Sequence, residues 1–104
     1  MIEWNQEELT AFFDNKQTGM VYFYTPLCGT CQVASKMLHV IEQLLPLELA
    51  LGKMNLNYHP DLARELAIES VPCLLFIKEG AVIDSIYAFH SVPFLLDKIK
   101  MNFE

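Results

Sequence analysis

The strongest constraint on the fold comes from a four-residue motif, Cys28-Gly29-Thr30-Cys31, and from the segments on either side of it. The segment before it, Met20 to Thr25, is apolar and rich in β-forming residues, and Pro26 ends it. From Cys31 onward, apolar residues recur at helical spacing with polar residues between them, which predicts an amphipathic helix that ends near Pro46. The sequence therefore predicts a C-x-x-C motif at the junction between a central strand and a long helix.

The spacing of Cys28 and Cys31 suits redox chemistry. Three residues apart on a first helical turn, two sulfur atoms can reach bonding distance, so the pair can alternate between dithiol and disulfide with little backbone movement. Cys28 would face unpaired N–H groups and the positive end of the helix dipole, which favour its thiolate. We expect Cys28 to be the nucleophile, and Cys31, shielded one turn inside the helix, to resolve a mixed disulfide.

Two other interpretations of the motif remain open. A C-x-x-C can supply half of a zinc site, and a cysteine can simply be a small core residue. Structural zinc normally takes a full set of four ligands. The chain has no second C-x-x-C, Cys73 is solitary, and His39 is predicted on the solvated side of the helix. We therefore favour the dithiol interpretation and expect neither a metal site nor a cofactor.

The rest of the chain alternates helices with strands. Asn5 is predicted to cap a short first helix, with Glu8 completing a capping box. Alternation over Leu47 to Leu51 predicts a half-buried strand whose inward-facing row continues to Lys53. Further elements are expected as a vestigial strand at Ile2 to Trp4, a short helix from Pro60 to Ala67, a second central strand from Val71 to Ile77, a hairpin partner from Ala81 to Tyr87, and a last helix capped by Ser91. This order predicts an α/β fold, with a central mixed sheet of four or five strands and helices on both faces.

Length, charge and hydropathy exclude several classes of protein. The 104 residues suit one domain spanning residues 1–104, and the 53% hydrophobic share provides a core. Thirteen acidic and seven basic residues give a net charge of -6 without a basic cluster, so we expect no nucleic-acid partner. The longest apolar run, Val71 to Ile77, is too short to span a membrane, and no signal peptide is evident. The odd number of cysteines leaves at least one thiol unpaired and suits a reducing compartment, so we expect a cytoplasmic protein. We also expect it to be a monomer.

Over nearly its whole length the chain resembles the thioredoxin family. Besides the C-x-x-C motif, the resemblance rests on Val71-Pro72, where the family has a cis-proline, and on Lys53-Met54-Asn55 at the end of the preceding strand. It implies the thioredoxin fold, with Pro72 packed against the active-site disulfide and the backbone of Val71 free to pair with an extended substrate segment. Leu27 would add an apolar contact to that substrate. Without the resemblance, Pro72 would be only a proline permitted at the start of a strand.

Four positions depart from the pattern of the family. Leu27 replaces a tryptophan, and Gly29-Thr30 replaces Gly-Pro, which puts a hydroxyl group close to the thiols. Tyr22 aligns with the buried aspartate that accepts a proton from the second cysteine, and tyrosine is a poor base at neutral pH. Ala88 replaces a glycine of the substrate groove, and the bulky Phe89 follows it. These changes predict an altered potential or rate.

Other residues allow more than one interpretation. Lys53 could point inward and bias a cysteine toward thiolate, or extend past the strand end into solvent, and both remain open. Cys73 is expected in the core. Tyr22 is most simply a core aromatic residue. His59 and His90 are expected in loops, and a place for His90 along the substrate groove is the less favoured alternative.

The sequence therefore predicts a thiol-disulfide oxidoreductase that reduces protein disulfides through Cys28 and Cys31. Its partners would be disulfide-containing proteins and a reductase that regenerates the dithiol. The competing hypothesis is a binding module or adaptor of thioredoxin fold with weak redox turnover, motivated by Tyr22, Leu27 and Ala88. Metal binding through the two cysteines ranks third.

Overall fold

The computed structural model describes all 104 residues and contains a five-stranded sheet in the spatial order β1-β3-β2-β4-β5. In chain order the elements are β1 (Ile2–Glu3), α1 (Gln6–Asp14), β2 (Gly19–Tyr24), α2 (Gly29–Glu42), β3 (Ala50–Asn55), the 3-10 helix η1 (Leu56–Tyr58), α3 (Pro60–Glu65), β4 (Cys73–Lys78), β5 (Ala81–Ile86) and α4 (Val92–Phe103). The strands β1, β2 and β3 are parallel, whereas β4 runs antiparallel to both β2 and β5. The predicted mixed α/β sheet is confirmed, with β1 as its fifth strand.

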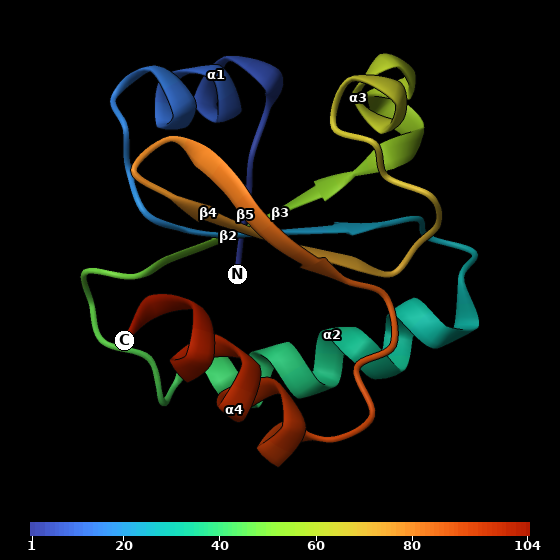
Figure 1. Cartoon of the computed structure of the whole chain (residues 1–104). Helices are drawn as coiled ribbons and strands as arrows, with labels where there is room; N and C mark the ends of the chain where they lie inside the picture. Colours follow the sequence, from blue (N-terminus) through green and yellow to red (C-terminus); the bar gives the residue numbers. More distant parts are fainter.

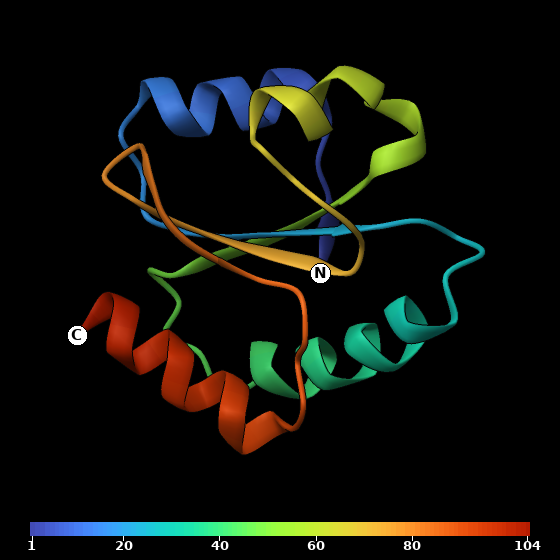
Figure 2. The ribbon, with the colours of Figure 1, turned by 45° about the vertical axis from the view of Figure 1, so that its right-hand side comes forward.

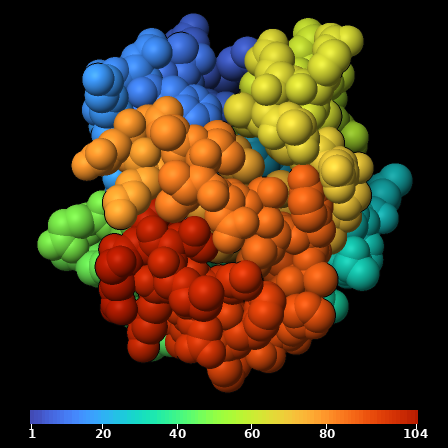
Figure 3. All heavy atoms as spheres, viewed as in Figure 1, coloured from blue at the N-terminus to red at the C-terminus, as the bar shows by residue number.

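Helices cover both faces of this sheet. The helices α1 and α3 lie on one face and α2 and α4 on the other (Figure 1). The turned view shows the same layers, with the sheet between the two pairs of helices (Figure 2). The start of α2 projects at the edge of the molecule, where it is drawn in teal at the right of the space-filling view (Figure 3). None of the helices is both long enough and apolar enough to span a membrane.

The central strand β2 supplies side chains to two separate cores. Met20 and Tyr22 are buried on the face covered by α2 and α4, and Val21 and Phe23 on the opposite face. All four are fully buried, as the apolar composition of this segment predicts for a strand covered on both sides. The connection from β2 to α2 therefore leaves a rigid part of the molecule.

Local sequence signals place the helix starts. The side chain of Asn5 accepts the N–H of Glu8, whose carboxylate accepts the N–H of Asn5, so the predicted capping box is confirmed. Ser91 caps α4 by accepting the N–H of Phe94. Both caps satisfy N–H groups that would otherwise lack a partner in the first helical turn.

The largest error of the sequence analysis lies between α2 and β3. The helix ends at Glu42 rather than near Pro46, and Leu44 and Leu47 are exposed. The strand begins at Ala50, three residues after the predicted start. Its position is set by pairing with β2, which matches Gly19 with Ala50 and continues for six residues. The alternating leucines therefore belong largely to a turn.

Other boundaries shift by smaller amounts. The helix α3 ends at Glu65, two residues before the predicted end. The strand β4 begins at Cys73, so Val71 and Pro72 lie in the preceding connection. The strand β5 ends at Ile86. These shifts move no residue between the two faces of the sheet.

Candidate functional site

Cys28 and Cys31 lie where β2 leads into α2. Cys28 is the N-cap of α2 and Cys31 lies in its first turn, and a disulfide joins them across a Cα–Cα distance of 5.1 Å. Cys28 is partly exposed, whereas Cys31 is only 2% exposed. The accessible sulfur suits attack on an external disulfide, and the shielded one suits attack on a bond already formed at Cys28.

The surroundings of the Cys28 sulfur favour a negative charge. It accepts the N–H of Cys31 at 3.1 Å, and the Thr30 hydroxyl lies 3.4 Å away. The first turn of α2 contains no acidic residue, and the positive end of the helix dipole lies at the same place. Reduction of the disulfide would therefore leave a sulfur with donors on two sides, which stabilises the thiolate.

The residues between and before the cysteines are exposed. Leu27 is 98% exposed, although most large apolar side chains of this chain are at least partly covered. Gly29 is also open, and a Cβ atom there would meet no other atom within 4 Å. Packing therefore does not explain the choice of residue at either position, and both are accessible to a partner.

The connection before β4 brings Val71 and Pro72 to the cysteines. The Cys28 sulfur lies 3.9 Å from the Val71 carbonyl oxygen, and the peptide bond between Val71 and Pro72 is cis. Pro72 is buried, whereas Val71 is partly exposed. Neither the N–H nor the carbonyl of Val71 takes part in a backbone–backbone hydrogen bond. The N–H and the carbonyl of Val71 are therefore without a backbone partner beside the partly exposed sulfur.

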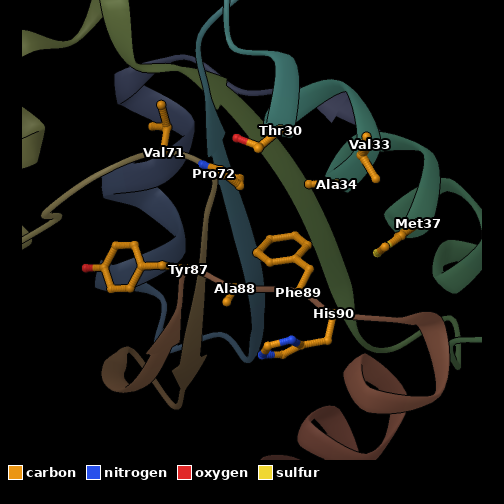
Figure 4. A pocket seen from close by; sticks show the side chains of 10 residues that line it. All are labelled: Thr30, Val33, Ala34, Met37, Val71, Pro72, Tyr87, Ala88, Phe89 and His90. Atoms are coloured by element: carbon orange, nitrogen blue, oxygen red, sulfur yellow. The ribbon is translucent and has the colours of Figure 1, made fainter.

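A groove of about 490 Å³ runs from this point between α2 and the connection that follows β5 (Figure 4). Its lining is mostly apolar and contains no lysine, arginine, aspartate or glutamate: Thr30, Val33, Ala34, Met37, Val71, Pro72, Tyr87, Ala88, Phe89 and His90. An extended segment with small or apolar side chains fits such a lining better than a charged one.

Ala88, Phe89 and His90 form the far wall of the groove. The Phe89 ring points between Pro72 and α2 and is buried in the core, so the bulk that the sequence placed beside Ala88 is directed inward (Figure 4). His90 has a φ of 57°, a left-handed conformation, and lines the groove while its ring lies edge-on to Phe94 at 4.6 Å. His90 therefore lies in a loop, as expected from the sequence, and it also lines the groove.

Tyr22 lies beneath the resolving cysteine. Its hydroxyl donates a hydrogen bond to the Cys31 carbonyl at 2.7 Å and accepts one from the Ser35 hydroxyl at 3.0 Å. Burial raises the pKa of Tyr22, against the opposing effect of the bond from Ser35. Tyr22 is therefore neutral at physiological pH and offers no base to Cys31. Ser35 was not among the residues predicted from the sequence, although its place one helical turn after Cys31 indicates a shared face.

Lys53 is half-buried and pairs with Tyr22 across β3 and β2. Its ammonium group lies 5.6 Å from the centre of the Tyr24 ring, within the range of a cation–π interaction. No hydrogen bond or ion pair joins Lys53 to either cysteine. The ammonium group of Lys53 therefore contacts the face of the Tyr24 ring and neither of the two cysteine sulfurs.

The third cysteine lies away from the groove. Cys73 is fully buried among apolar residues on the face of the sheet covered by α1 and α3, as the sequence analysis expected. Burial raises its pKa to about 11. No group of three or more His, Cys, Asp and Glu side chains is placed to bind one metal ion.

Comparisons with known proteins extend these observations. The thioredoxin family model matches residues 1–100. A thioredoxin-like protein of Bacillus subtilis, YusE, is 46% identical over 102 residues, which cover 98% of this chain and 93% of that protein. Thioredoxin of Chlamydia caviae is 31% identical over 82% of this chain and 84% of its own length. Among solved structures, oxidised mitochondrial thioredoxin 3 of Saccharomyces cerevisiae superimposes with a TM-score of 0.83 at 22% identity, covering 97% of this chain and 94% of that one.

Proposed function

Because the chain belongs to the thioredoxin family and carries the C-x-x-C pair of a thiol-disulfide oxidoreductase, we propose that it reduces disulfide bonds in proteins. Cys28 is the nucleophile in this proposal and Cys31 the resolving cysteine. Val71, Pro72 and Leu27 bind the substrate segment, Thr30 supports the Cys28 thiolate and Tyr22 holds the backbone of Cys31. Gly29 leaves the turn between the two thiols open, whereas Lys53, a supporting residue expected from the sequence, contacts Tyr24 and neither thiol.

The reaction transfers two electrons in two exchanges. The Cys28 thiolate attacks one sulfur of the substrate disulfide, forms a mixed disulfide and releases the first substrate thiolate, which takes up a proton. The Cys31 thiolate then attacks the Cys28 sulfur and releases the second substrate thiolate. The substrate is reduced and Cys28 and Cys31 are oxidised to their disulfide. A reductase or a dithiol must then return two electrons to this pair.

One observation carries the proposal: the unpaired peptide group of Val71 lies beside the Cys28 sulfur. An extended substrate segment that pairs with this peptide group, as an added strand would, brings its own sulfur next to Cys28. The adjoining groove accepts apolar side chains of the same segment. Substrate binding and nucleophilic attack thus use neighbouring atoms.

Insulin reduction with dithiothreitol tests the proposal directly. The wild-type protein should accelerate precipitation of the insulin B chain, and Cys28→Ser should abolish the acceleration. Cys31→Ser provides the matched variant, because it keeps the nucleophile and should accumulate a mixed disulfide with insulin. Wild-type protein that binds insulin without accelerating its reduction would instead support the adaptor, for which the neutral Tyr22 beneath Cys31 is the favouring observation.

We also propose that the protein works as a monomer in the cytoplasm. The support for a reducing compartment is the free thiol of Cys73. The net charge of -6 without a basic cluster argues against nucleic acid as a partner. Sedimentation of the reduced protein at micromolar concentration tests the monomer.

A further inference from the structure

Two hydroxyl groups connect the central strand β2 to the first turn of α2. Ser35 donates a hydrogen bond to the Tyr22 hydroxyl at 3.0 Å, and Tyr22 donates to the Cys31 carbonyl at 2.7 Å. The three residues come from two elements, and their groups form one continuous chain of donors and acceptors. This series of hydrogen bonds ends at the backbone carbonyl of Cys31, the resolving cysteine.

The Tyr22 ring is held in place by the core around β2 rather than by α2. The ring is fully buried, stacks on Tyr24 at 5.6 Å between centres and meets Phe89 edge-on at 6.1 Å. The first turn of a helix is the part most free to move, because its N–H groups lack helical partners. A hydroxyl on a rigid strand that binds the Cys31 carbonyl therefore fixes that turn relative to the sheet.

Ser35 gives the Tyr22 hydroxyl its direction. A tyrosine oxygen can donate one hydrogen bond and accept others. Since Ser35 occupies an acceptor position, the Tyr22 proton is left to point at Cys31. Ser35 also lines a hollow of about 390 Å³ that reaches Cys31, so water can partly replace its hydroxyl if it is removed.

We propose that Ser35 is a positioning residue for the resolving cysteine and acts through Tyr22 on the backbone of Cys31. The orientation of the Cys31 peptide unit sets where its sulfur lies relative to Cys28, and displacement along a sulfur–sulfur axis demands close alignment. The inference rests on the proposed function, because only a protein that resolves mixed disulfides needs this alignment. Neither residue touches the Cys28 sulfur, so the first exchange should not depend on them.

The two exchanges can be separated with dithiobis-nitrobenzoate, an aromatic disulfide that releases a coloured thiolate. Attack by Cys28 on the reagent releases one thiolate in a phase whose rate increases with reagent concentration. Attack by Cys31 on the resulting mixed disulfide releases the second thiolate in a phase independent of that concentration. Stopped-flow absorbance on the fully reduced protein therefore measures each cysteine in one experiment.

We expect Tyr22→Phe to slow the second phase about three- to tenfold, the fold-change of one hydrogen bond, and to leave the first phase unchanged. Ser35→Ala should slow the second phase about twofold, because water compensates in part, and Ser35→Thr should restore it. In the Tyr22→Phe background, Ser35→Ala should not slow the second phase further. The Tyr22 hydroxyl that connects Ser35 to Cys31 is already missing in that background.

Tyr24→Phe is the matched control. It removes a hydroxyl from the same strand, whose partner is Glu3 instead of Cys31, and should leave both phases unchanged. Equal second phases in wild type, Tyr22→Phe and Ser35→Ala would overturn the positioning role while leaving the proposed function intact. If Ser35→Ala still slowed the second phase in the Tyr22→Phe background, the result would show that Ser35 does not act through Tyr22. A wild-type protein without a second phase would overturn the proposed function and this inference together.

Discussion

The sulfur of Cys28 lies 3.9 Å from the carbonyl oxygen of Val71, although 43 positions separate the two residues in the chain. The contact joins the start of α2 to the connection before β4. Two groups meet there. The Cys28 sulfur lies in an environment that favours its thiolate, and the backbone N–H and carbonyl of Val71 have no backbone partner. The contact defines the surface at which a disulfide would be exchanged.

Reactivity should differ sharply among the three thiols. In the reduced protein near neutral pH, brief treatment with iodoacetamide should modify Cys28 first. Cys31 is nearly inaccessible, and burial both shields Cys73 and raises its pKa to about 11, which removes its thiolate at this pH. Peptide mapping after short labelling measures the order. Modification of Cys73 as fast as Cys28 would show that the core around β4 opens readily.

Leu27 should matter for protein substrates and not for stability. Leu27→Ala removes a side chain that is 98% exposed, so the free energy of unfolding should change by less than about 0.5 kcal/mol. If this side chain is covered by a bound substrate, its loss should lower kcat/KM for insulin by about tenfold. The rate with the small hydroxyethyl disulfide should stay the same.

The control for this comparison is Leu47→Ala. Leu47 is equally exposed but lies in the turn between α2 and β3. Leu47→Ala should therefore leave both rates at the wild-type value. Equal losses of insulin reduction in the two variants would show that Leu27 makes no specific contact.

The sequence predicted most of the fold because its patterns have single physical causes. A strand segment buried on both faces must be apolar, and β2 and the buried part of β4 up to Ile77 are. An N-cap needs a short polar side chain, and Asn5 and Ser91 both cap as predicted. The error at Leu47 has a different origin. Alternation marks which side chains share a face, but pairing with β2 decides where the strand lies.

The site was predictable only where the chemistry lies within one short segment. Cys28 and Cys31 are neighbours on a single turn, so their spacing indicated the disulfide. The placement of Pro72 against the disulfide, with the backbone of Val71 free for a substrate, was predicted through family resemblance alone. The hydrogen bond from Ser35 to Tyr22 joins side chains of different elements, and no pattern within either element requires it.

The buried thiol of Cys73 should make stability depend on pH. Its pKa is raised by burial from about 9 to about 11, so between these values the folded protein keeps a proton that the unfolded chain releases. The stabilisation is fully present below pH 9 and is lost as the pH rises through 11. The loss should reach about 1.4 kcal/mol at pH 10.

Urea unfolding of a Cys28→Ser/Cys31→Ser variant at pH 8 and pH 10 measures this loss, because the Cys73 thiolate of the unfolded chain would otherwise attack the disulfide. Cys73→Ala in the same background should reduce the difference between the two pH values by about 1.3 kcal/mol, which is nearly the whole contribution of this thiol. The contribution from tyrosines with raised pKa, Tyr22 and Tyr24, is shared by both proteins and cancels in the comparison. An identical pH dependence in the variant would contradict the assignment of this titration to Cys73.

The redox potential should be that of a reductant. Gly29 and Thr30, the residues between the cysteines, carry no positive charge that would strongly stabilise the reduced form. We expect a value near the thioredoxin potential of about -270 mV rather than the -120 mV or so of a strong oxidant. Equilibration with glutathione buffers of known ratio gives the value. A potential above about -200 mV would rule out the reducing direction.

Tyr22 is the departure from the family with the largest expected consequence. Cys31 must lose its proton in a shielded place before it can attack, and burial opposes its ionisation. Tyr22 stays neutral because its pKa is raised, so the mixed disulfide at Cys28 should decay slowly near neutral pH and faster as the pH rises. Tyr22→Asp would supply a base.

A general base contributes about a hundredfold or more to a proton transfer, whereas losing one hydrogen bond to the Cys31 carbonyl costs only a few-fold. Tyr22→Asp should therefore accelerate the decay near pH 7 and flatten its pH dependence. The measurement is the decay rate of a mixed disulfide at Cys28 between pH 6 and 9 in both proteins. A buried carboxylate and the lost aromatic packing should also lower the free energy of unfolding by several kcal/mol, so circular dichroism must show that the variant is folded. A folded Tyr22→Asp variant with the wild-type rate and pH profile would mean that Cys31 already gives its proton to another group, and the hollow beside Ser35 would be the place to look for it.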